Sequence, residues 1–448
     1  MTTRPTRIRR LGAVLVAAAL VAACGGDDDD DAGTDAASDD PAPGDTAEPT
    51  AEPTTEPTAA PTAEPSDDPA TSDGEPTGDT GGEPGPADGE PIKIGAVVSL
   101  TGPAVFPEAS AAASAYFDHV NDNGGVDGRP IEYITVDDAG DPNQAASAAR
   151  SLVEDTGVVV LGGGASLLEC AVNGQYYAEQ AIMNVSGTGV DPGCFAAPNT
   201  SPVNTGPYLG TTVSLYYLSE DRGFERVCYV QQSVPSFNDA FTAAAEQWSA
   251  LTGKELAMPI QFFNPTDDVT PLVVSLGGSC DAVFMSLNEA PLLALMQAVQ
   301  LQSAGDEMVL MSQTSGFTEQ VAEALGDVGQ GLLANSEFLP FNSDDPALDE
   351  WRAIMEANDV PLTSFAIGGY LAAKILVDTL DGLDGDVTRE SVTAALAALE
   401  SYETPLLGNP YSFGVADAHN PNRSSMIVEL VDGMWTTLTG EWVSLPAG

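Results

Sequence analysis

Apolar and polar residues follow one another along the chain in blocks that have the lengths of strands and helices. Residues 92–98 form an apolar run rich in β-branched side chains, and residues 109–120 carry Tyr116, Phe117 and Val120 at helical spacing. The helix is expected to end at Asn123-Gly124-Gly125, because Asn and Gly tolerate the left-handed backbone conformation found at helix ends. The alternation continues with strands expected at residues 131–136, 158–161 and 181–186 and a helix at residues 143–155.

This alternation predicts a parallel sheet with right-handed crossovers and helices on both faces. A second set of blocks begins near residue 203. It has strands expected at residues 226–230, 256–262, 281–286, 308–311 and 331–339 and helices at residues 207–220 and 239–251. Three more helices, at residues 346–358, 364–380 and 389–399, are assigned to the first set, and strands at residues 425–430 and 435–442 to the second.

The predicted fold is α/β, with two doubly wound lobes. Lobe 1 comprises residues 91–205 and 338–415, and lobe 2 comprises residues 206–337 and 416–448. The 358 residues from 91 onward are enough for two lobes of ordinary size. Trp248 and Trp351 stand within helical apolar patterns and are expected in the cores.

The first residues have the pattern of an export signal. Four arginines precede an apolar run over residues 11–23 that is too short to span a membrane. Val21-Ala22-Ala23-Cys24 is typical of a lipobox, in which residues 1–23 are removed and Cys24 carries a lipid. An ordinary cleavage site with an incidental cysteine is the alternative. We therefore predict a lipoprotein held at the extracytoplasmic face of the cell membrane through Cys24.

Residues 24–90 are predicted to be a disordered tether. Residues 25–90 contain 21 acidic residues and 11 prolines but no Lys or Arg, and they include repeats such as Ala51-Glu52-Pro53-Thr54. Such a segment lacks the apolar surface to offset the entropy of ordering, and charge repulsion extends it. A spacer between membrane and domain is the favoured interpretation, and a tail that binds cations or a partner is the alternative.

The charge balance excludes nucleic acid as a partner. Removing the four signal arginines and the 21 tether acids from the totals of 14 and 67 leaves 10 basic and 46 acidic residues, a net charge near −36. Phosphate neutralisation requires clustered Lys and Arg, which this chain lacks.

We expect the protein to be a monomer.

Three segments resemble the substrate-binding proteins of ABC transporters that carry branched-chain and other amino acids. They are residues 92–103, residues 123–131 with Gly124-Gly125-Val126-Asp127-Gly128-Arg129-Pro130, and residues 136–142 with Asp137-Asp138 and Asp141-Pro142. The resemblance, weaker elsewhere, covers residues 91–448. It implies the type I periplasmic binding fold, a three-strand hinge, a small polar ligand between the lobes and an ABC permease as membrane partner.

The candidate ligand site lies in the loops beyond the carboxyl ends of the strands, where open α/β sheets bind ligands. Alignment with the family's pattern identifies eight candidate ligand-binding residues: Phe106, Ala165, Ser166, Ser186, Thr188, Phe237, Asn288 and Gln313. Tight packing of small residues is the alternative for the first-lobe loops.

The second lobe departs from the family's pattern. Relatives that bind amino acids often place an acid near Gln313 or Thr314, where this chain has none. Glu289 is a possible substitute, although a helix-start position is the simpler interpretation. An α-amino acid ligand is therefore in doubt, and an amide, a carboxylate or another small polar molecule stays open.

Four cysteines besides Cys24 suggest two disulfides, since the chain is exported. In a doubly wound lobe of the flavodoxin-like order, the first and third strands are neighbours, which favours Cys228–Cys280. Cys170 and Cys194 then remain to pair. Four free thiols are the alternative. We expect no metal and no cofactor, because there is no Cys-x-x-Cys and the only histidines are His119 and His419.

Two other functional classes remain as alternatives to transport. A hydrolase using Ser166 or Ser186 would need a base that the sequence does not offer, and there is no Gly-x-Ser-x-Gly elbow. No catalytic residue is therefore predicted. A ligand sensor that signals through a protein partner fits the same fold and is not separated from a transport receptor by sequence.

Overall fold

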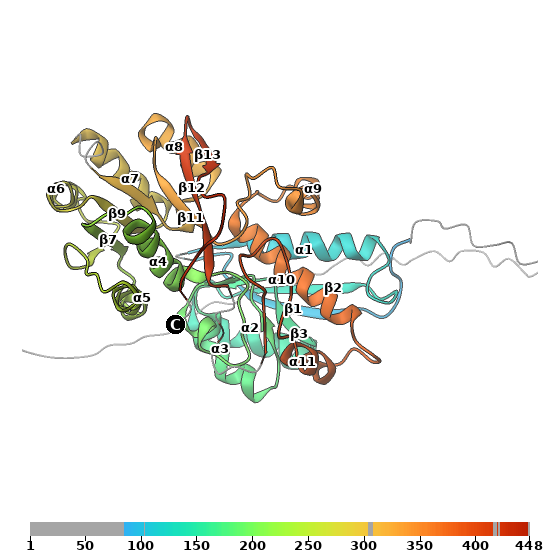
Figure 1. Cartoon of the computed structure of the whole chain (residues 1–448). Coiled ribbons are helices and arrows are strands. Elements are labelled where there is room, and N and C mark those ends of the chain that lie inside the picture. The colour runs from blue at the N-terminus through green and yellow to red at the C-terminus, as the bar shows by residue number, and fades with distance from the viewer. Residues whose placement is uncertain (1–84, 103, 303–307, 415–418, 420–421, 447–448) are drawn as a thin grey trace, which may run out of the picture. The chain divides into compact units, whose positions relative to one another are not determined.

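Two β-sheets, each with helices packed against both faces, make up the part of the chain described by the computed structural model (Figure 1). The described residues are 85–102, 104–302, 308–414, 419 and 422–446. The predicted signal peptide, Cys24 and the tether up to residue 84 lie outside them. No helix within the described ranges has the length and apolar character needed to cross a membrane.

The first sheet belongs to the first lobe and is parallel throughout its described part. Its strand order is β2-β1-β3-β5, from β1 (Ile92–Val98), β2 (Ile131–Asp137), β3 (Val160–Gly162) and β5 (Asn184–Val185). The helices of this lobe are α1 (Pro107–Asp122), α2 (Pro142–Arg150), α3 (Glu169–Glu179), α9 (Asp349–Ala357), α10 (Ser364–Asp381) and α11 (Arg389–Ala397).

The second sheet, in the second lobe, combines parallel and antiparallel strands. Its main path runs β13-β12-β11-β10-β9-β7-β8, where β7 to β11 are parallel and β12 and β13 are antiparallel. The strands are β7 (Val227–Gln232), β8 (Gln261–Phe263), β9 (Ala282–Ser286), β10 (Val309–Ser312), β11 (Leu333–Ser336), β12 (Ser424–Val431) and β13 (Met434–Thr437). The helices are α4 (Gly206–Tyr216), α5 (Asn238–Thr252), α6 (Thr270–Ser279), α7 (Glu289–Leu301) and α8 (Glu319–Leu325).

The period-two alternation of the strands explains why both faces of the first sheet are covered. Ile92 and Ile94 on β1 pack into the core beneath α1 and α10, whereas Val97 packs with Leu152 and Tyr177 on the side of α2 and α3. The prediction of two doubly wound lobes is confirmed, including the β8-β7-β9-β10 order at the edge of the second sheet.

Helices α1 and α10 lie side by side although they are far apart in the sequence (Figure 1). A glycine makes this close approach possible. A Cβ atom added to Gly369 would lie 1.8 Å from the Ala109 carbonyl oxygen. The buried Trp248 and Trp351 are 1% and 0% exposed, which confirms their expected place in the cores.

Three crossover segments connect the lobes, at residues 203–206, 337–340 and 422–424, and they are hydrogen-bonded to one another. Thr205 Oγ1 donates to Ser424 O at 2.8 Å, and Asn422 Nδ2 donates to Glu337 O at 2.8 Å. The Gly206 N–H donates to Glu337 Oε1 at 2.7 Å. These bonds confirm the three-strand hinge that the family resemblance implies.

Several expected boundaries differ from the structure, among them the strand expected at residues 435–442, which is divided into β13 and β14 (Val443–Ser444). The edge strand β8 covers only Gln261–Phe263 instead of residues 256–262, because Pro259 has no N–H with which to join the ladder. The ordered chain also begins before residue 91. The N–H groups of Ala87 and Gly89 donate to carbonyls of the first lobe at 3.0 and 2.9 Å, so the expected tether does not extend to residue 90.

Both favoured disulfides, Cys170–Cys194 and Cys228–Cys280, are present. Cys228 stands on β7 and Cys280 comes just before β9, and these strands are neighbours as the sequence predicted. The two thiols therefore meet at one end of adjacent strands.

Removing the Cys228–Cys280 crosslink with C228S/C280S is expected to lower the free energy of unfolding by about 2 to 4 kcal/mol. The crosslink joins residues 52 apart and so restricts the unfolded chain. Urea unfolding of the full-length chain under oxidising conditions measures the change. The double variant C170S/C194S, whose cysteines are 24 residues apart, should lose less. An unchanged urea midpoint for C228S/C280S would contradict the expectation.

Candidate functional site

A cavity of about 360 Å³ lies between the two lobes, a size suited to a small molecule. Loops at the carboxyl ends of strands in both sheets line it, together with two of the crossover segments. Its described polar lining consists of five amide side chains, four hydroxyls and one carboxylate: Asn204, Gln231, Gln232, Asn288, Gln313, Thr188, Ser286, Thr314, Ser315 and Glu337.

Four phenylalanines supply most of the apolar wall. Phe106 and Phe365 come from the first lobe and meet edge to face, with their ring centroids 5.9 Å apart. Phe237 and Phe241 come from the start of α5 in the second lobe. Aromatic surfaces therefore face the cavity from both lobes.

The one charged group in the described lining is Glu337, which is 1% exposed. Its Oε1 accepts from the Gly206 N–H at 2.7 Å and from Asn204 Nδ2 at 3.2 Å. Asn204 also bonds both main-chain polar groups of Gly189, at 2.8 and 3.3 Å. Glu337 is thus linked to the first-lobe loop that contains Thr188.

Three buried oxygens of the lining have no hydrogen-bond partner among the described residues. They are Thr188 Oγ1 from the first lobe, Thr314 Oγ1 from the second and Glu337 Oε2 from a crossover segment. A buried polar group without a partner costs about 1 to 3 kcal/mol. Each lobe and one crossover segment therefore contribute one unpartnered oxygen in a residue that lines the cavity.

Burial raises the pKa of Glu337 to about 7, although the hydrogen bonds from Gly206 and Asn204 act in the opposite direction. Desolvation penalises the charged carboxylate more than those two bonds stabilise it. A ligand that donates to Oε2 would compensate part of this cost.

Five of the eight predicted residues line the cavity: Phe106, Thr188, Phe237, Asn288 and Gln313. The other three, Ala165, Ser166 and Ser186, are not among the lining residues. Ser166 Oγ donates to Asp138 and accepts from the N–H groups of Leu168 and Glu169 at the start of α3, at 3.0 and 2.9 Å. Its hydroxyl is therefore occupied by the lobe itself.

Small-residue packing accounts for the other two positions. Ser186 Oγ donates to Gly164 O at 3.4 Å. Ala165 lies in the short strand β4 (Ala165–Ser166), which pairs with β6 (Thr188–Gly189). Both residues are buried and hold the Thr188 loop in place from behind.

The sequence analysis missed Glu337, Asn204 and Phe365 in the cavity wall. Glu337 left a signal, since it is the only charged residue between residues 331 and 341 in a run expected to form a strand. A lone acid in an apolar run is rarely buried without a purpose. Glu289, the acid proposed as a substitute, is exposed and lines a neighbouring hollow instead.

Further buried acids lie behind the first-lobe loops. Burial, reinforced by the charges of Asp191 and Asp138, raises the pKa of Glu169 to about 8. Burial also raises the pKa of Asp191 to about 6. Tyr177 donates to Glu169 Oε1 at 2.8 Å, so that this carboxyl is part of the lobe's internal network.

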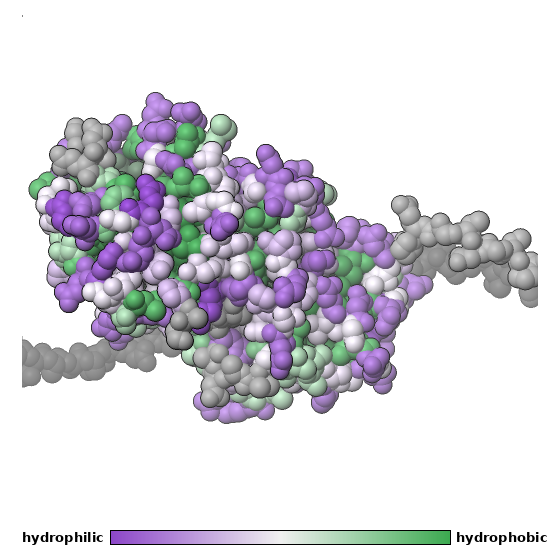
Figure 2. Space-filling model, in the orientation of Figure 1, coloured by the Kyte–Doolittle hydropathy of each residue, from purple (hydrophilic) through white to green (hydrophobic). Residues whose placement is uncertain are grey.

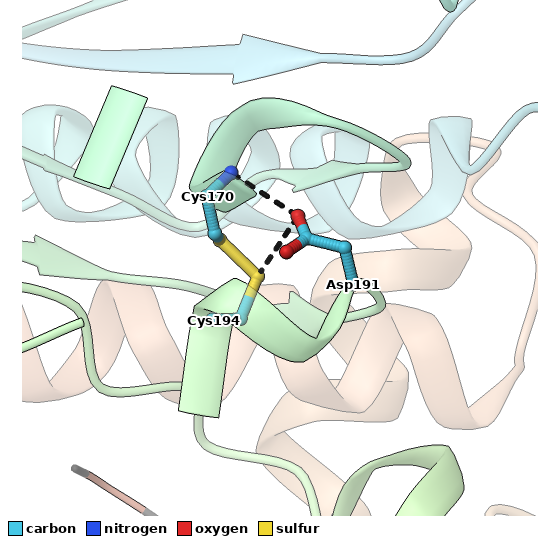
Figure 3. A group of neighbouring side chains, drawn as sticks. All are labelled: Cys170, Asp191 and Cys194. Atoms are coloured by element: carbon cyan, nitrogen blue, oxygen red, sulfur yellow. Dashed lines mark hydrogen bonds between the residues drawn. A yellow bond between two sulfur atoms is a disulfide. The ribbon is translucent and has the colours of Figure 1, made fainter. Parts of the chain in front are cut away.

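Cys170, Asp191 and Cys194 form the one group in the described part of the chain with the spacing of metal ligands (Figure 3). The Asp191 carboxylate accepts from the Cys170 N–H at 3.2 Å and lies 3.7 Å from Cys194 Sγ. Both sulfurs are bonded to each other, so neither is a thiolate that would bind a metal.

The family model of the periplasmic binding proteins matches residues 91–434, which include the first sheet, the second sheet through β12 and every residue of the cavity lining. The chain is a periplasmic binding protein. More closely, it is of type I, the fold of ABC-transporter receptors for amino acids. Such proteins bind solutes outside the cytoplasm and catalyse no reaction, which sets aside the hydrolase alternative.

Similar proteins support this membership. The leucine-, isoleucine-, valine-, threonine- and alanine-binding protein of Pseudomonas aeruginosa is 23% identical over 326 residues, 69% of this chain and 83% of that relative. Two solved structures share the fold of this periplasmic binding protein. A substrate-binding protein from Streptococcus pneumoniae in complex with isoleucine has a TM-score of 0.66 at 16% identity, over 79% of this chain and all of that one. A solute-binding protein from Rhodopseudomonas palustris in complex with p-hydroxybenzoic acid has a TM-score of 0.66 at 18% identity, over 80% and 98%.

The raised pKa predicts a pH-dependent effect of Glu337→Gln on the stability of this binding protein. The unfolded chain titrates this carboxyl near its ordinary pKa of about 4.3. Between that pH and about 7, the native state keeps a proton that the unfolded state releases, so wild-type stability falls as pH rises. The full loss in the free energy of unfolding of wild type across this pH range is on the order of 3 kcal/mol. E337Q should therefore gain stability relative to wild type between pH 5 and pH 8, measured by urea unfolding.

The exposed Glu246→Gln on α5 is the matched control for that experiment, and its difference from wild type should not change with pH. A difference between E337Q and wild type that is the same at both pH values would show that the Glu337 pKa is not raised.

Proposed function

We propose that this periplasmic binding protein is a lipid-anchored receptor that captures a small polar solute between its lobes and delivers it to an ABC permease. The observation that carries the proposal is the set of unpartnered oxygens in the cavity, Thr188 Oγ1, Thr314 Oγ1 and Glu337 Oε2. One comes from each lobe and one from the hinge. A solute that bonds to all three would be held only when the lobes are together.

Lobe closure is the signal to the permease in this proposal. The moving bodies correspond to residues 91–205 with 338–415 and residues 206–337 with 416–448. A ligand shifts an equilibrium between open and closed forms by its difference in affinity for them. Micromolar binding supplies about 8 kcal/mol in total, enough to favour the closed form strongly.

The proposed ligand contacts are those predicted residues that line the cavity. Phe106 and Phe237 would enclose the solute from opposite lobes, while Asn288 and Gln313 would offer amide groups from the second lobe. The two solved relatives are complexes with isoleucine and with p-hydroxybenzoic acid, so solutes of that size suit the fold. Ala165, Ser166 and Ser186 would support the loops.

A thermal-shift screen of the full-length chain tests the receptor proposal. The panel contains amino acids, amides, short carboxylates, amines and sugars. A solute at 100 times its dissociation constant should stabilise the protein by about 2.7 kcal/mol. Thr188→Val and Thr314→Val should each weaken binding of the identified solute roughly tenfold, because each removes one hydrogen bond in a buried site.

Thr200→Val provides the matched control, since Thr200 Oγ1 is also buried without a described partner but does not line the cavity. The Thr200→Val variant should bind the identified solute with the affinity of wild type. A folded, ligand-free protein that shifts with no member of the panel would count against the receptor proposal and favour the sensor alternative.

The lipid anchor has its own test. In the proposal, Cys24 carries the lipid and the acidic segment up to residue 84 spans the distance from the membrane. Cys24→Ala should move the protein from the membrane fraction to the soluble fraction without changing solute affinity, as measured by fractionation and immunoblotting. Retention of the variant in the membrane fraction would contradict anchoring through Cys24.

A further inference from the structure

The described lining of the cavity contains one acid and no Lys, Arg or His. A neighbouring hollow of about 260 Å³ shares Phe106 and Phe365 with the cavity wall. It adds two more acids, Glu108 and Glu289, and again no cationic side chain among its described residues. The charges around the site are therefore all negative in the part of the chain that the structure describes.

Several main-chain N–H groups at this cavity are not available to a carboxylate. The N–H groups of six lining residues already donate to protein acceptors: Phe106, Thr188, Gly189, Phe237, Asn288 and Gln313. An anionic group placed here would meet Glu337 without a compensating cation, which is costly in a buried site.

Hydrogen-bond acceptors without a described partner, in contrast, occur in three of the residues that line the cavity. Glu337 Oε2, Thr188 Oγ1 and Thr314 Oγ1 are buried and lack described partners. An ammonium group has three N–H donors and no acceptor, so it matches a set of free oxygens. The surrounding phenylalanine rings suit the hydrocarbon part of such a solute, and their faces attract a nearby cation.

We propose that the solute is an organic cation of the amine class, with an apolar body and no carboxylate. Its ammonium group pairs with Glu337, and its hydrocarbon lies among Phe106, Phe237, Phe241 and Phe365. The inference rests on the receptor function proposed above and specifies its substrate class. The net charge of −53 favours the approach of cations over anions. The face shown in Figure 2 mixes hydrophilic with hydrophobic residues, so that polar solutes meet a partly polar surface.

The ionisable side chains on the segments packed around Glu337 lie beside groups other than its carboxylate. Arg423 is exposed and lines a separate hollow beside α5. His419 packs edge-on against Phe413, and the Tyr208 hydroxyl donates to a main-chain carbonyl. Direct contacts to the Glu337 carboxylate come from the Gly206 N–H and the Asn204 amide, neither of which titrates.

The test uses solutes that share a body and differ only at the charged end. Calorimetry on the full-length chain compares 3-methylbutylamine, leucine and 4-methylpentanoate, and separately phenethylamine, phenylalanine and 3-phenylpropanoate. Putrescine and choline extend the amine set. At least one amine should bind ten times more tightly than every amino acid and every acid in the series.

Variants at Glu337 then test the contact itself. E337Q should weaken amine binding roughly tenfold to 100-fold, because a charge-assisted bond is replaced by a neutral one. Amine affinity of wild type should fall at least tenfold from pH 8 to pH 5, as Glu337 becomes protonated, and E337Q should show no such fall. Glu169→Gln, which replaces another buried acid with an amide outside the cavity lining, is the matched control and should bind as wild type does.

The outcomes separate this inference from the receptor function. Binding of amino acids, acids or neutral amides without binding of any amine overturns the inference and leaves the receptor function standing. Amine binding that E337Q leaves unchanged also overturns it. Failure of every compound in this series and in the wider screen, with folded and ligand-free protein, overturns both. If E337Q does not fold, the comparison of solutes and the pH dependence on wild type still decide the inference.

Discussion

The site depends on the junction that Glu337 makes between the three crossover segments. One carboxylate oxygen accepts from Gly206 at the start of α4 and from Asn204, and the main-chain carbonyl of the same residue accepts from Asn422. A single buried acid thus joins the points at which the chain passes from lobe to lobe. Glu337 also lines the cavity, and its second carboxylate oxygen has no described partner, so the residue that joins the crossover segments is at the same time part of the candidate site.

The loops of the first lobe show how an internal network fixes a binding surface. Asp138 accepts hydrogen bonds from the hydroxyls of Ser99 and Ser166, and Ser166 also accepts from the Glu169 N–H at the start of α3. The hydroxyls of Ser99 and Ser166 are therefore bonded within the lobe, whereas the buried Thr188 hydroxyl, in a residue that lines the cavity, has no described partner. The buried Asp138 thus supports the binding surface without being part of the cavity lining.

The fold was predictable because it follows from the periodicity of apolar residues along the chain. The site was only partly predictable because it depends on which way individual side chains point. Strands such as Ile92–Val98 followed from their apolar pattern, and Cys228–Cys280 followed from strand order. Ser166 and Thr188 are similar in the sequence, yet the Ser166 hydroxyl is bonded within the lobe and only Thr188 lines the cavity. Glu337 could not be placed, since only the packing of three distant segments buries it.

The positions of the two disulfides have a mechanical consequence. Cys170 and Cys194 both belong to the first lobe, and Cys228 and Cys280 both belong to the second. Each covalent link therefore stiffens one body and does not tie it to the other. Oxidation can therefore stabilise each lobe against unfolding without placing a covalent bond across the crossover segments.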